Sequence, residues 1–277
     1  MPWPDRRSRS RSRLVGLAIL GFLTLLLLTA PVIAPHDPAA VDPDHRLEGP
    51  TSTFPLGTDH LGRCLLSRLL HGARWSLGMA AVASLVILVI GTSVGGVAGY
   101  YRGPLDAVLM RVVDVLLAFP SLIPAMAIAG VLGPGLAHVL VAIVAVWWAG
   151  YARLVRGLVL SVRERPFVDA ARALGARDGG ILRRHILPNV LPPVLVLASV
   201  ETGTLILAMA SLSFLGLGAQ PPTPEWGAML NDGRGFLLTA PQLMIYPGLA
   251  ISLAVVGFNL VGEAFPDYLD PHLTRMR

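Results

Sequence analysis

Few polar side chains in this 277-residue sequence have the residue type and the position that catalysis or solute binding requires. One carboxylate, Glu201, stands inside a long apolar run, with Ser199, Thr202 and Thr204 as polar neighbours. An ionisable group in such a run is expected to face a cavity, a partner or a hydrogen-bond donor, because a charge in hydrocarbon is costly. Glu201 is therefore a candidate for a translocation path, and a structural hydrogen bond or a buried protonated state are the alternatives.

Other kinds of site find less support in the sequence. The residues that resemble metal ligands gather near the start of the chain: His36, Asp37, Asp42, Asp44 and His45. Imidazole and carboxylate groups can bind metals, but Pro35, Pro38 and Pro43 lie among them and favour turns. The only cysteine, Cys64, excludes an intrachain disulfide and a cysteine-based metal site. No nucleophile has an adjacent base, so we expect no catalytic residue, no metal and no enzyme.

The composition indicates a membrane protein. Hydrophobic residues make up 54% of the chain and charged residues 14%, with a mean hydropathy of +0.65, whereas soluble domains contain about 25% charged residues. The net charge of +5 is compatible with a nucleic-acid partner. However, all 22 basic residues are arginines that fall between apolar runs, as topology signals do. We therefore expect a lipid bilayer, and no nucleic acid, as the partner of this chain.

Six apolar stretches predict transmembrane helices: 14–34, 76–98, 112–131, 136–152, 190–212 and 246–261. The first would be about 30 Å long as a helix, which matches a hydrocarbon core. It exceeds the apolar segment of about 7–15 residues in a cleaved signal peptide, so we interpret it as an uncleaved span. The second contains Gly91, Gly95 and Gly96, with Gly99 directly after it, and these glycines allow close approach of another helix. The third carries two prolines.

The arginines then predict the topology and the domain organisation. Six spans place both termini on one side, and with the termini inside, 17 of the 22 arginines are cytoplasmic. This gives a cytoplasmic basic tail at 1–13, a first transmembrane helix at 14–34 and an extracytoplasmic segment at 35–75. A membrane core follows at 76–265, with a cytoplasmic loop at 153–188 and an extracytoplasmic loop at 215–242, and a cytoplasmic tail at 266–277. Leucines at helical spacing predict an interfacial helix at 61–75, beside the outside exceptions Arg63, Arg68 and Arg74.

The loop at 153–188 is the most charged part of the chain, with eight arginines. Pro166 can start a short helix, Asp169 suits its first turn, and Gly175 allows a reversal after it. Small alanines between these residues would let the helix lie deep in a groove of a partner, while arginines pair with acids at the rim. The alternative is a basic loop that only fixes topology.

The spacing within this loop is more specific than its charge. The residues concerned are Asp169, Ala170, Ala171, Gly175, Leu187 and Pro188. They closely resemble the signature of binding-protein-dependent ABC importer permeases, which is acid-Ala-Ala, three residues, Gly, nine residues, Ile-x-Leu-Pro. Asp169 stands where Glu is usual in that signature, and His185 takes the place of the Ile.

Further segments look like the C-type permease of the dipeptide, oligopeptide and nickel importers: 54–63, 66–70, 213–218, 221–227 and 269–273. Cys64 stands where such proteins usually carry Asp. The resemblance covers nearly the whole chain. It implies an all-α, type I importer permease fold of about six transmembrane helices with cytoplasmic termini, in the bacterial inner membrane.

The same resemblance implies the partners and the site. A homologous second permease would form a heterodimer with this chain, an extracytoplasmic solute-binding protein would deliver peptides or nickel chelates, and two ATPase subunits would bind a coupling helix. Its residues would be Phe167, Asp169, Ala170, Ala171, Leu174, Gly175, Leu187 and Pro188. The chain has no GxxxxGK[ST] loop, so we expect it to bind no cofactor and the partner subunits to hold ATP and Mg. An ion-driven secondary transporter is the competing class, and Glu201 gives it weak support.

Overall fold

The computed structural model describes the backbone of residues 6–264 and the side chains of residues 14–262. The predicted cytoplasmic tail at 266–277 lies outside these residues. Within them the chain is helical, without β-strands, apart from loops and one isolated bridge. The long helices are α1 (Arg6–Ile33), α2 (Leu65–Tyr101), α5 (Leu136–Arg163), α8 (Leu187–Phe214) and α10 (Gln242–Ala264). The shorter ones are α3 (Gly103–Leu117), α4 (Leu122–Leu132), α6 (Pro166–Ala173), α7 (Asp178–Ile181) and α9 (Trp226–Gly233).

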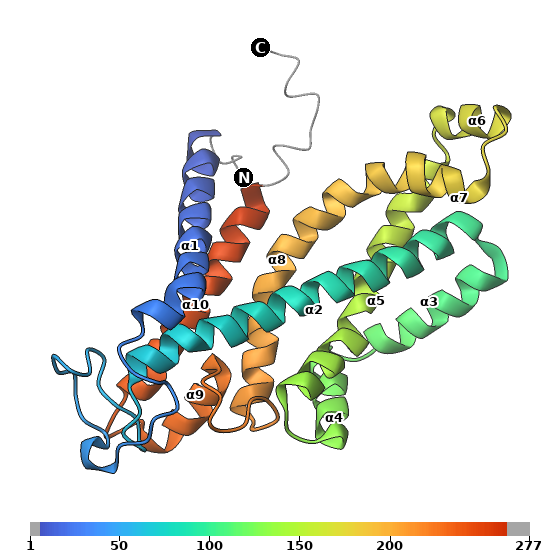
Figure 1. Ribbon diagram of the computed structural model, residues 1–277. Coiled ribbons are helices and arrows are strands. Elements are labelled where there is room, and N and C mark those ends of the chain that lie inside the picture. Colours follow the sequence, from blue (N-terminus) through green and yellow to red (C-terminus); the bar gives the residue numbers. More distant parts are fainter. Residues whose placement is uncertain (1–5, 265–277) are drawn as a thin grey trace.

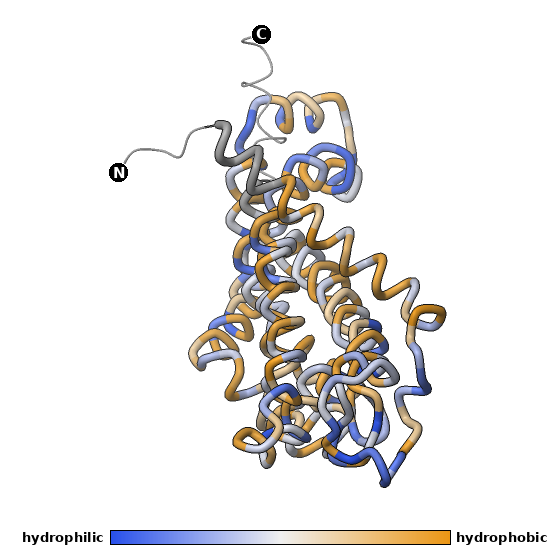
Figure 2. The backbone as a smooth tube through the Cα atoms, turned by 90° about the vertical axis from the view of Figure 1, so that its left-hand side faces the viewer, coloured by the Kyte–Doolittle hydropathy of each residue, from blue (hydrophilic) through white to orange (hydrophobic). Residues whose placement is uncertain are grey.

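The helices form an elongated bundle with two distinct ends (Figure 1). The first turns of α1, the last turns of α10 and the short helices α6 and α7 lie at one end, and the segment 34–64 lies with α9 at the other. Figure 2 shows that most hydrophilic stretches gather towards these two ends, whereas the helices between them are largely apolar. This distribution fits a bundle that crosses a bilayer along its long axis.

The prediction of about six spans is confirmed. Five helical segments are long and apolar enough to cross a membrane: Leu14–Ile33, Leu65–Tyr101, Leu136–Arg163, Asp178–Phe214 and Gln242–Gly262. The sixth is α3 with α4, which are bent by 88° relative to each other. The segment expected at 112–131 is therefore not one continuous helix, because it is broken between Leu117 and Leu122. Pro120 explains the break, because it disfavours a helical conformation at Phe119 and has no N–H to donate.

The interfacial helix expected at 61–75 is not a separate element. Residues from Leu65 onward form the first turns of α2, a single helix of 37 residues, which is about 56 Å long and longer than a hydrocarbon core. Arg63 and Arg68, expected at the outer surface, have side chains that are only 2% exposed. Arg74 alone of the three lies at the surface. The two buried arginines are paired with acids, as described below.

Glycines set the distance between α2 and α5. A Cβ atom on Gly95 would lie 2.3 Å from the carbonyl oxygen of Ala152, and one on Gly99 would lie 2.9 Å from that of Arg156. A Cβ on Gly91 would lie 2.3 Å from the Cβ of Tyr151. The predicted close approach is thus confirmed at three glycines spaced four residues apart, a pattern that brings membrane helices together.

The two terminal helices pack in the same way. A Cβ on Gly257 of α10 would lie 2.8 Å from Cγ2 of Ile19 in α1, and one on Gly16 would lie 2.8 Å from Cβ of Leu260. Thus α1 is held against the bundle mainly through α10, and α10 in turn packs on α8, where a Cβ on Gly262 would lie 2.3 Å from Cγ2 of Val200.

Adjacent glycines of α2 offer a matched test of the α2–α5 contact. A Cβ on Gly96 would lie no closer than 3.7 Å to its nearest neighbour, Cδ2 of Leu187. Gly95→Ala should therefore lower the free energy of unfolding by about 1–3 kcal/mol, since the helices must separate. Gly96→Ala should be neutral or raise it by up to about 1 kcal/mol, because alanine favours a helix over glycine. Thermal unfolding of the purified protein in detergent measures both, and equal melting temperatures would contradict the proposed packing.

Candidate functional site

The loop between α5 and α8 folds as its sequence predicts. Arg165 is extended, Pro166 occupies the first position of α6, and Gly175 has a positive φ of 81°. The N–H of Gly175 donates to the carbonyl of Arg172 at 3.0 Å, and that of Ala176 donates to the carbonyl of Ala171 at 3.1 Å. These two bonds define a Schellman motif, which needs a residue that tolerates the left-handed conformation. Gly175 therefore fixes the end of α6.

Helix α6 has an inner and an outer face. Val168 is fully buried and Ala171 is 8% exposed, and both join the main hydrophobic core together with Ile181 of α7. On the outer face Phe167 is 40% exposed and Leu174 is 88% exposed. The helix is therefore fastened to the bundle by small apolar side chains, and it presents two large ones outward.

The structure thus divides the residues predicted to contact an ATPase. Those at the surface are Phe167, Asp169, Ala170, Leu174, Gly175 and Pro188. Ala171 is 8% exposed and points into the core, because the helical period places it beside Val168, three residues earlier. Its part in an ATPase contact stays a prediction. Leu187 is half-buried, and its Cδ2 packs against α2 at Gly96.

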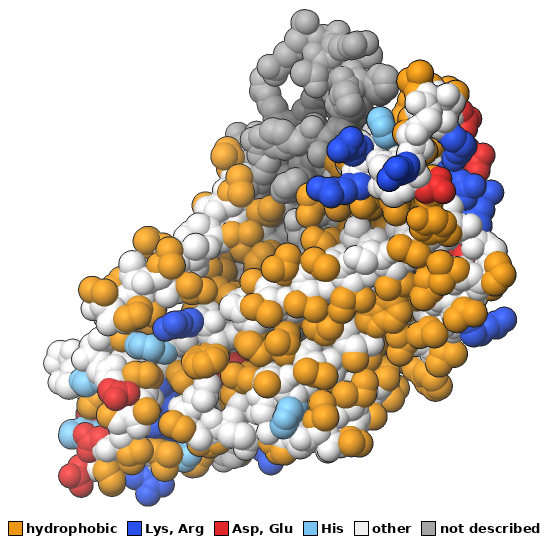
Figure 3. All heavy atoms as spheres, turned by 45° about the vertical axis from the view of Figure 1, so that its right-hand side comes forward, with side chains coloured by type: hydrophobic (Ala, Val, Ile, Leu, Met, Phe, Trp, Pro, Cys, Tyr) orange, Lys and Arg blue, Asp and Glu red, His pale blue; other side chains and the backbone are white. Residues whose placement is uncertain are grey.

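Charged side chains surround this apolar tip. Asp169 accepts a hydrogen bond from Arg172 at 2.9 Å, and both side chains are exposed. Arg177, Arg183 and Arg184 are also at the surface. In Figure 3 basic and acidic side chains gather at this end of the molecule, and a broad hydrophobic surface lies beyond them. The arrangement offers an apolar contact ringed by charges, which is typical of a protein interface.

Two further ion pairs that the sequence did not predict bind α3 to the loop end of α5. Arg156 of α5 contacts both carboxylate oxygens of Asp106, at 2.5 and 2.6 Å. Arg102, which precedes α3, contacts Glu164 at 3.0 Å. Asp106 and Arg156 lie 50 residues apart in the sequence, and Arg102 and Glu164 lie 62 apart. Sequence spacing could therefore not predict either pair.

Glu201 lies on α8 in a small polar group within the spans. It is half-buried, and it is close enough to the hydroxyl of Tyr151 on α5 to interact with it electrostatically. The Tyr151 side chain is fully buried, and its hydroxyl has no hydrogen bond to other described residues. Next to Glu201, the hydroxyl of Thr202 lies 3.0 Å from that of Ser84 on α2. A hydroxyl of α5 therefore lies near this carboxylate, and the next residue of α8 makes a polar contact with α2.

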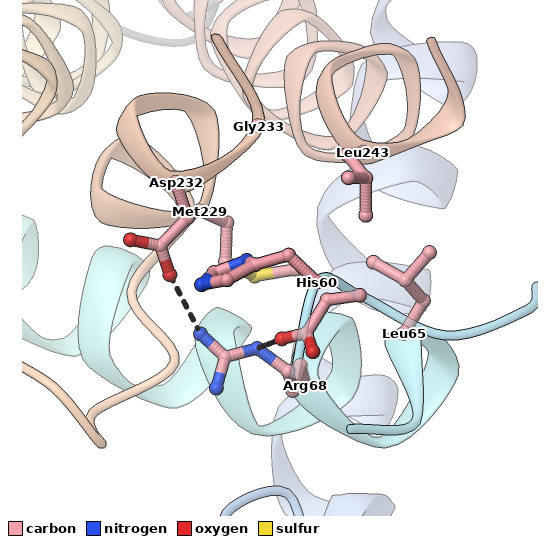
Figure 4. A pocket seen from close by; sticks show the side chains of 8 residues that line it. His60, Leu65, Arg68, Met229, Asp232, Gly233 and Leu243 are labelled. Carbon is pink, nitrogen blue, oxygen red and sulfur yellow. Dashed lines mark hydrogen bonds and ion pairs between the residues drawn. The ribbon is translucent and has the colours of Figure 1, made fainter. Parts of the chain in front are cut away.

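A buried ion cluster joins distant segments at the opposite end. Arg63 Nε lies 2.6 Å from Asp59, and its Nη2 lies 3.3 Å from Asp232 of α9. Arg68 lies 3.5 Å from Asp59 and 3.4 Å from Asp232 (Figure 4). Two acids thus neutralise two buried arginines, which lowers the cost of burying them. His60 stacks on Phe236 beside the cluster, with ring centroids 5.4 Å apart.

Helix α9 is anchored to α2 by a second set of contacts. The carboxylate of Glu225 accepts hydrogen bonds from the N–H groups of Gly227 and Ala228, each at 2.9 Å, and from the hydroxyl of Ser76 at 3.0 Å. The indole of Trp226 donates to the carbonyl of Leu69 at 3.0 Å. A helix cap and an interhelical bond therefore use the same buried carboxylate.

The acids near the start of the chain form turns, as predicted. Asp37 accepts from the N–H of Ala39 at 2.8 Å, and Asp42 accepts from that of Asp44 at 3.3 Å. The hydrogen bond to Asp42, and then its negative charge, raise the pKa of the exposed His45. Within residues 14–262, no group of three or more His, Cys, Asp or Glu side chains is arranged to hold a metal.

The sequence matches two protein families. Residues 87–275 match the family described as "Binding-protein-dependent transport system inner membrane component", and residues 6–50 match the "N-terminal TM domain of oligopeptide transport permease C".

Similar proteins include several named transport permeases. The dipeptide transport system permease protein DppC of Alkalihalophilus pseudofirmus is 42% identical over 98% of this chain and 90% of its own length. The nickel transport system permease protein NikC of Escherichia coli is 45% identical over 94% of each chain. The glutathione transport system permease protein GsiD of Pectobacterium atrosepticum is 44% identical over 98% of this chain and 92% of its own.

The fold is similar to that of a solved transporter structure. That structure is an inward-facing conformation of the MetNI methionine ABC transporter, matched with a TM-score of 0.58 over 74% of this chain and 98% of that chain, at 21% sequence identity.

Proposed function

This chain belongs to the binding-protein-dependent transport system inner membrane components, and from that membership we propose that α6 couples it to the ATPase subunits of an importer. The chain is a multi-pass permease of an ATP-binding-cassette importer in the inner membrane. The observation that carries the proposal is the form of α6: a short helix at one end of the bundle, with Leu174 88% exposed among charged side chains. Exposed apolar side chains of this kind mark contact surfaces.

The mechanism follows from how α6 is held. Val168 and Ala171 fasten it to the core, and the motif at Gly175 fixes its end, so a partner that grips Phe167 and Leu174 moves the whole segment. In the proposed cycle, ATP and Mg²⁺ are bound by two partner ATPase subunits, because this sequence lacks a phosphate-binding loop. Their closure displaces α6, and the membrane helices respond by alternating access to the path between them.

We propose three further partners on the same basis. A homologous second permease completes the translocation path as a heterodimer with this chain. An extracytoplasmic solute-binding protein docks at the end formed by residues 34–64 and α9. The end with α6, with the start of α1 and the end of α10, is then cytoplasmic, in agreement with the arginine-rich loop located there.

Cross-linking tests the role of α6. Ala170→Cys carrying a thiol-linked photo-cross-linker should become joined to an ATPase subunit of the cognate importer, because Ala170 lies on the outer face of α6. Ala171→Cys is the matched control, since Ala171 itself is only 8% exposed and a cysteine there should react poorly. The native Cys64 is 2% exposed and gives little background. Failure of Ala170→Cys to reach an ATPase would exclude the coupling role.

The same reagents test the topology. Leu238, at the opposite end, is 97% exposed. In intact cells, Leu238→Cys should react with a membrane-impermeant maleimide, and Ala170→Cys should react only after permeabilisation. The reverse pattern would place α6 outside the cell.

For the solute, we propose a peptide or nickel in chelated form. The similar permeases named above serve dipeptide, nickel and glutathione transport, two of which are peptides. Calorimetry on the cognate binding protein should show that it binds a dipeptide, an oligopeptide or a nickel chelate with a Kd of about 1 μM or lower. Binding of none of these, together with binding of an unrelated solute such as a sugar, would contradict the proposal.

We also propose that Glu201 borders the translocation path. Its carboxylate is half-buried in a span, where an ionisable group is expected to face a cavity or a partner. Glu201→Gln keeps the shape and removes the charge, so in proteoliposomes it should change uptake by about tenfold and leave the melting temperature unchanged. Ser199→Ala is the control, since Ser199 bonds only to Leu195 of its own helix among the described residues. Normal uptake with a lowered melting temperature would assign Glu201 a structural role.

A further inference from the structure

The segment that contains α6 and α7 has two covalent connections to the bundle, and they differ in stiffness. Towards α5 only two residues, Glu164 and Arg165, separate the helices. Towards α8 the chain passes through a π-helical turn at Leu182–Ile186, and α8 contains Pro192 and Pro193. A π-turn and internal prolines each disturb the regular hydrogen-bond ladder, and such places are where helices bend. The connection to α8 is therefore the softer of the two.

A third, non-covalent connection leads to α2. Tyr100 lies in the last turn of α2, is 4% exposed, and donates a hydrogen bond of 2.6 Å from its hydroxyl to Oδ1 of Asp178. Asp178 is the first residue of α7 and lies 78 residues further along the chain. The distance is typical of a hydroxyl that donates to an ionised carboxylate, which is a stronger bond than one between neutral groups. The end of α2 is thus joined directly to the segment that carries α6.

Tyr100 is itself held in place. Arg163, the last residue of α5, donates a hydrogen bond to the carbonyl oxygen of Tyr100. The guanidinium carbon of Arg163 also lies 5.6 Å from the centre of the Tyr100 ring, a distance that suits a cation–π contact. Tyr101 packs edge-on against the same ring, with centroids 5.1 Å apart. These contacts orient the Tyr100 hydroxyl towards Asp178.

The contacts form a closed frame. Helix α2 is packed on α5 through Gly91, Gly95 and Gly99, α5 leads directly into α6, and α7 returns to α2 through Tyr100. Without the Tyr100–Asp178 bond, the segment would be held by its chain connections to α5 and to the π-turn and by the apolar contacts of Val168, Ala171 and Ile181 with the core. With it, the segment cannot tilt relative to α2 and α5 without breaking a hydrogen bond.

We infer that Tyr100 is a positioning residue for coupling: it ties the α6–α7 segment to α2, so that a displacement of α6 moves α2 and α5 together. The inference rests on the proposed role of α6 as the contact with the ATPase subunits. Coupling of this kind requires a continuous path of packed or hydrogen-bonded groups between the two sites. The bond between Tyr100 and Asp178 supplies that path to α2 independently of α8.

The test uses the complete importer, with its second permease and ATPase subunits, in liposomes that are supplied with the binding protein and solute. Uptake and ATP hydrolysis are measured together, and their ratio reports coupling. Tyr100→Phe removes only the hydroxyl, so the ratio should fall about tenfold while ATP hydrolysis stays within about twofold of the wild type, as expected for the loss of one bond to a charged group. A change confined to the ratio distinguishes positioning from a general loss of stability.

The neighbouring residue provides a matched control. Tyr101 is 51% exposed, and its hydroxyl makes no hydrogen bond among the residues whose side chains the structure describes. Tyr101→Phe makes the same chemical change one residue away and should leave the ratio as in the wild type.

Substitution of the acceptor gives the second arm. Asp178→Asn retains an oxygen that can accept the bond and should keep the ratio within about threefold of the wild type, whereas Asp178→Ala should match Tyr100→Phe. The double variant Tyr100→Phe with Asp178→Ala should be no worse than either single variant, because both remove the same interaction.

Two results would overturn the inference: an unchanged ratio in Tyr100→Phe, or a parallel fall of uptake and ATP hydrolysis. Failure of the proposed function is recognised separately, since the Ala170→Cys cross-link to the ATPase would then be missing in the protein with Tyr100 intact.

Discussion

The close contact between α2 and α5 determines how the rest of the bundle is placed. Lipid tails are as apolar as leucine, so membrane helices gain little from hiding apolar side chains from each other, and their association depends on close packing. Gly91, Gly95 and Gly99 provide that packing along two turns of α2, because an added Cβ would meet the backbone or Cβ atoms of α5. Since α5 continues almost directly into α6, the orientation of α2 is fixed relative to the proposed coupling helix as well.

Arginine plays two different physical roles at the two ends of the molecule. At the end with α9, Arg63 and Arg68 are 2% exposed and share Asp59 and Asp232 as partners, so removal of one charge would leave others buried and unpaired. At the end with α6, pairs such as Arg172 with Asp169 are exposed and contribute little to stability. The first end is therefore a rigid cap, and the second has charges that remain available to a partner. In the proposed topology, this difference also explains why the two buried arginines depart from the positive-inside rule: they form structural ion pairs and are not topology signals.

The sequence predicted the features that depend on neighbouring residues. Span number follows from local hydropathy, and the form of α6 follows from Pro166, Asp169 and Gly175, whose preferences act within one or two turns. The break near Pro120 was missed because a proline in a membrane helix is compatible with both a kink and a break. The continuity of α2 from Leu65 was missed because leucine spacing alone does not distinguish an interfacial helix from the start of a long one.

Features that depend on tertiary contacts could not be predicted from the sequence. Asp232 lies 169 residues from Arg63, and Asp178 lies 78 residues from Tyr100, so no spacing rule connects these partners. The inward orientation of Ala171 follows from the position of α6 on the bundle, and a single short helix with alanines on several faces does not reveal which face is buried. Recognition of the loop signature located the proposed coupling segment, but only the fold shows which of its residues reach the surface.

The contacts of α8 show how one helix can connect both ends of the bundle and still bend near one of them. Its middle is held by Thr202 beside Ser84 of α2, and its far end is packed against α9, where a Cβ on Gly227 would lie 2.5 Å from the carbonyl of Ala210. The π-turn at 182–186 directly precedes its near end, and Pro192 and Pro193, which have no N–H to donate, lie in its first two turns. Bending at that near end would change the position of the α6–α7 segment relative to α8 and leave the contacts of α8 with Ser84 and α9 in place. Alternating access requires that one end of the path opens while the other stays closed, and a helix that is soft at one end and fixed at the other meets that requirement.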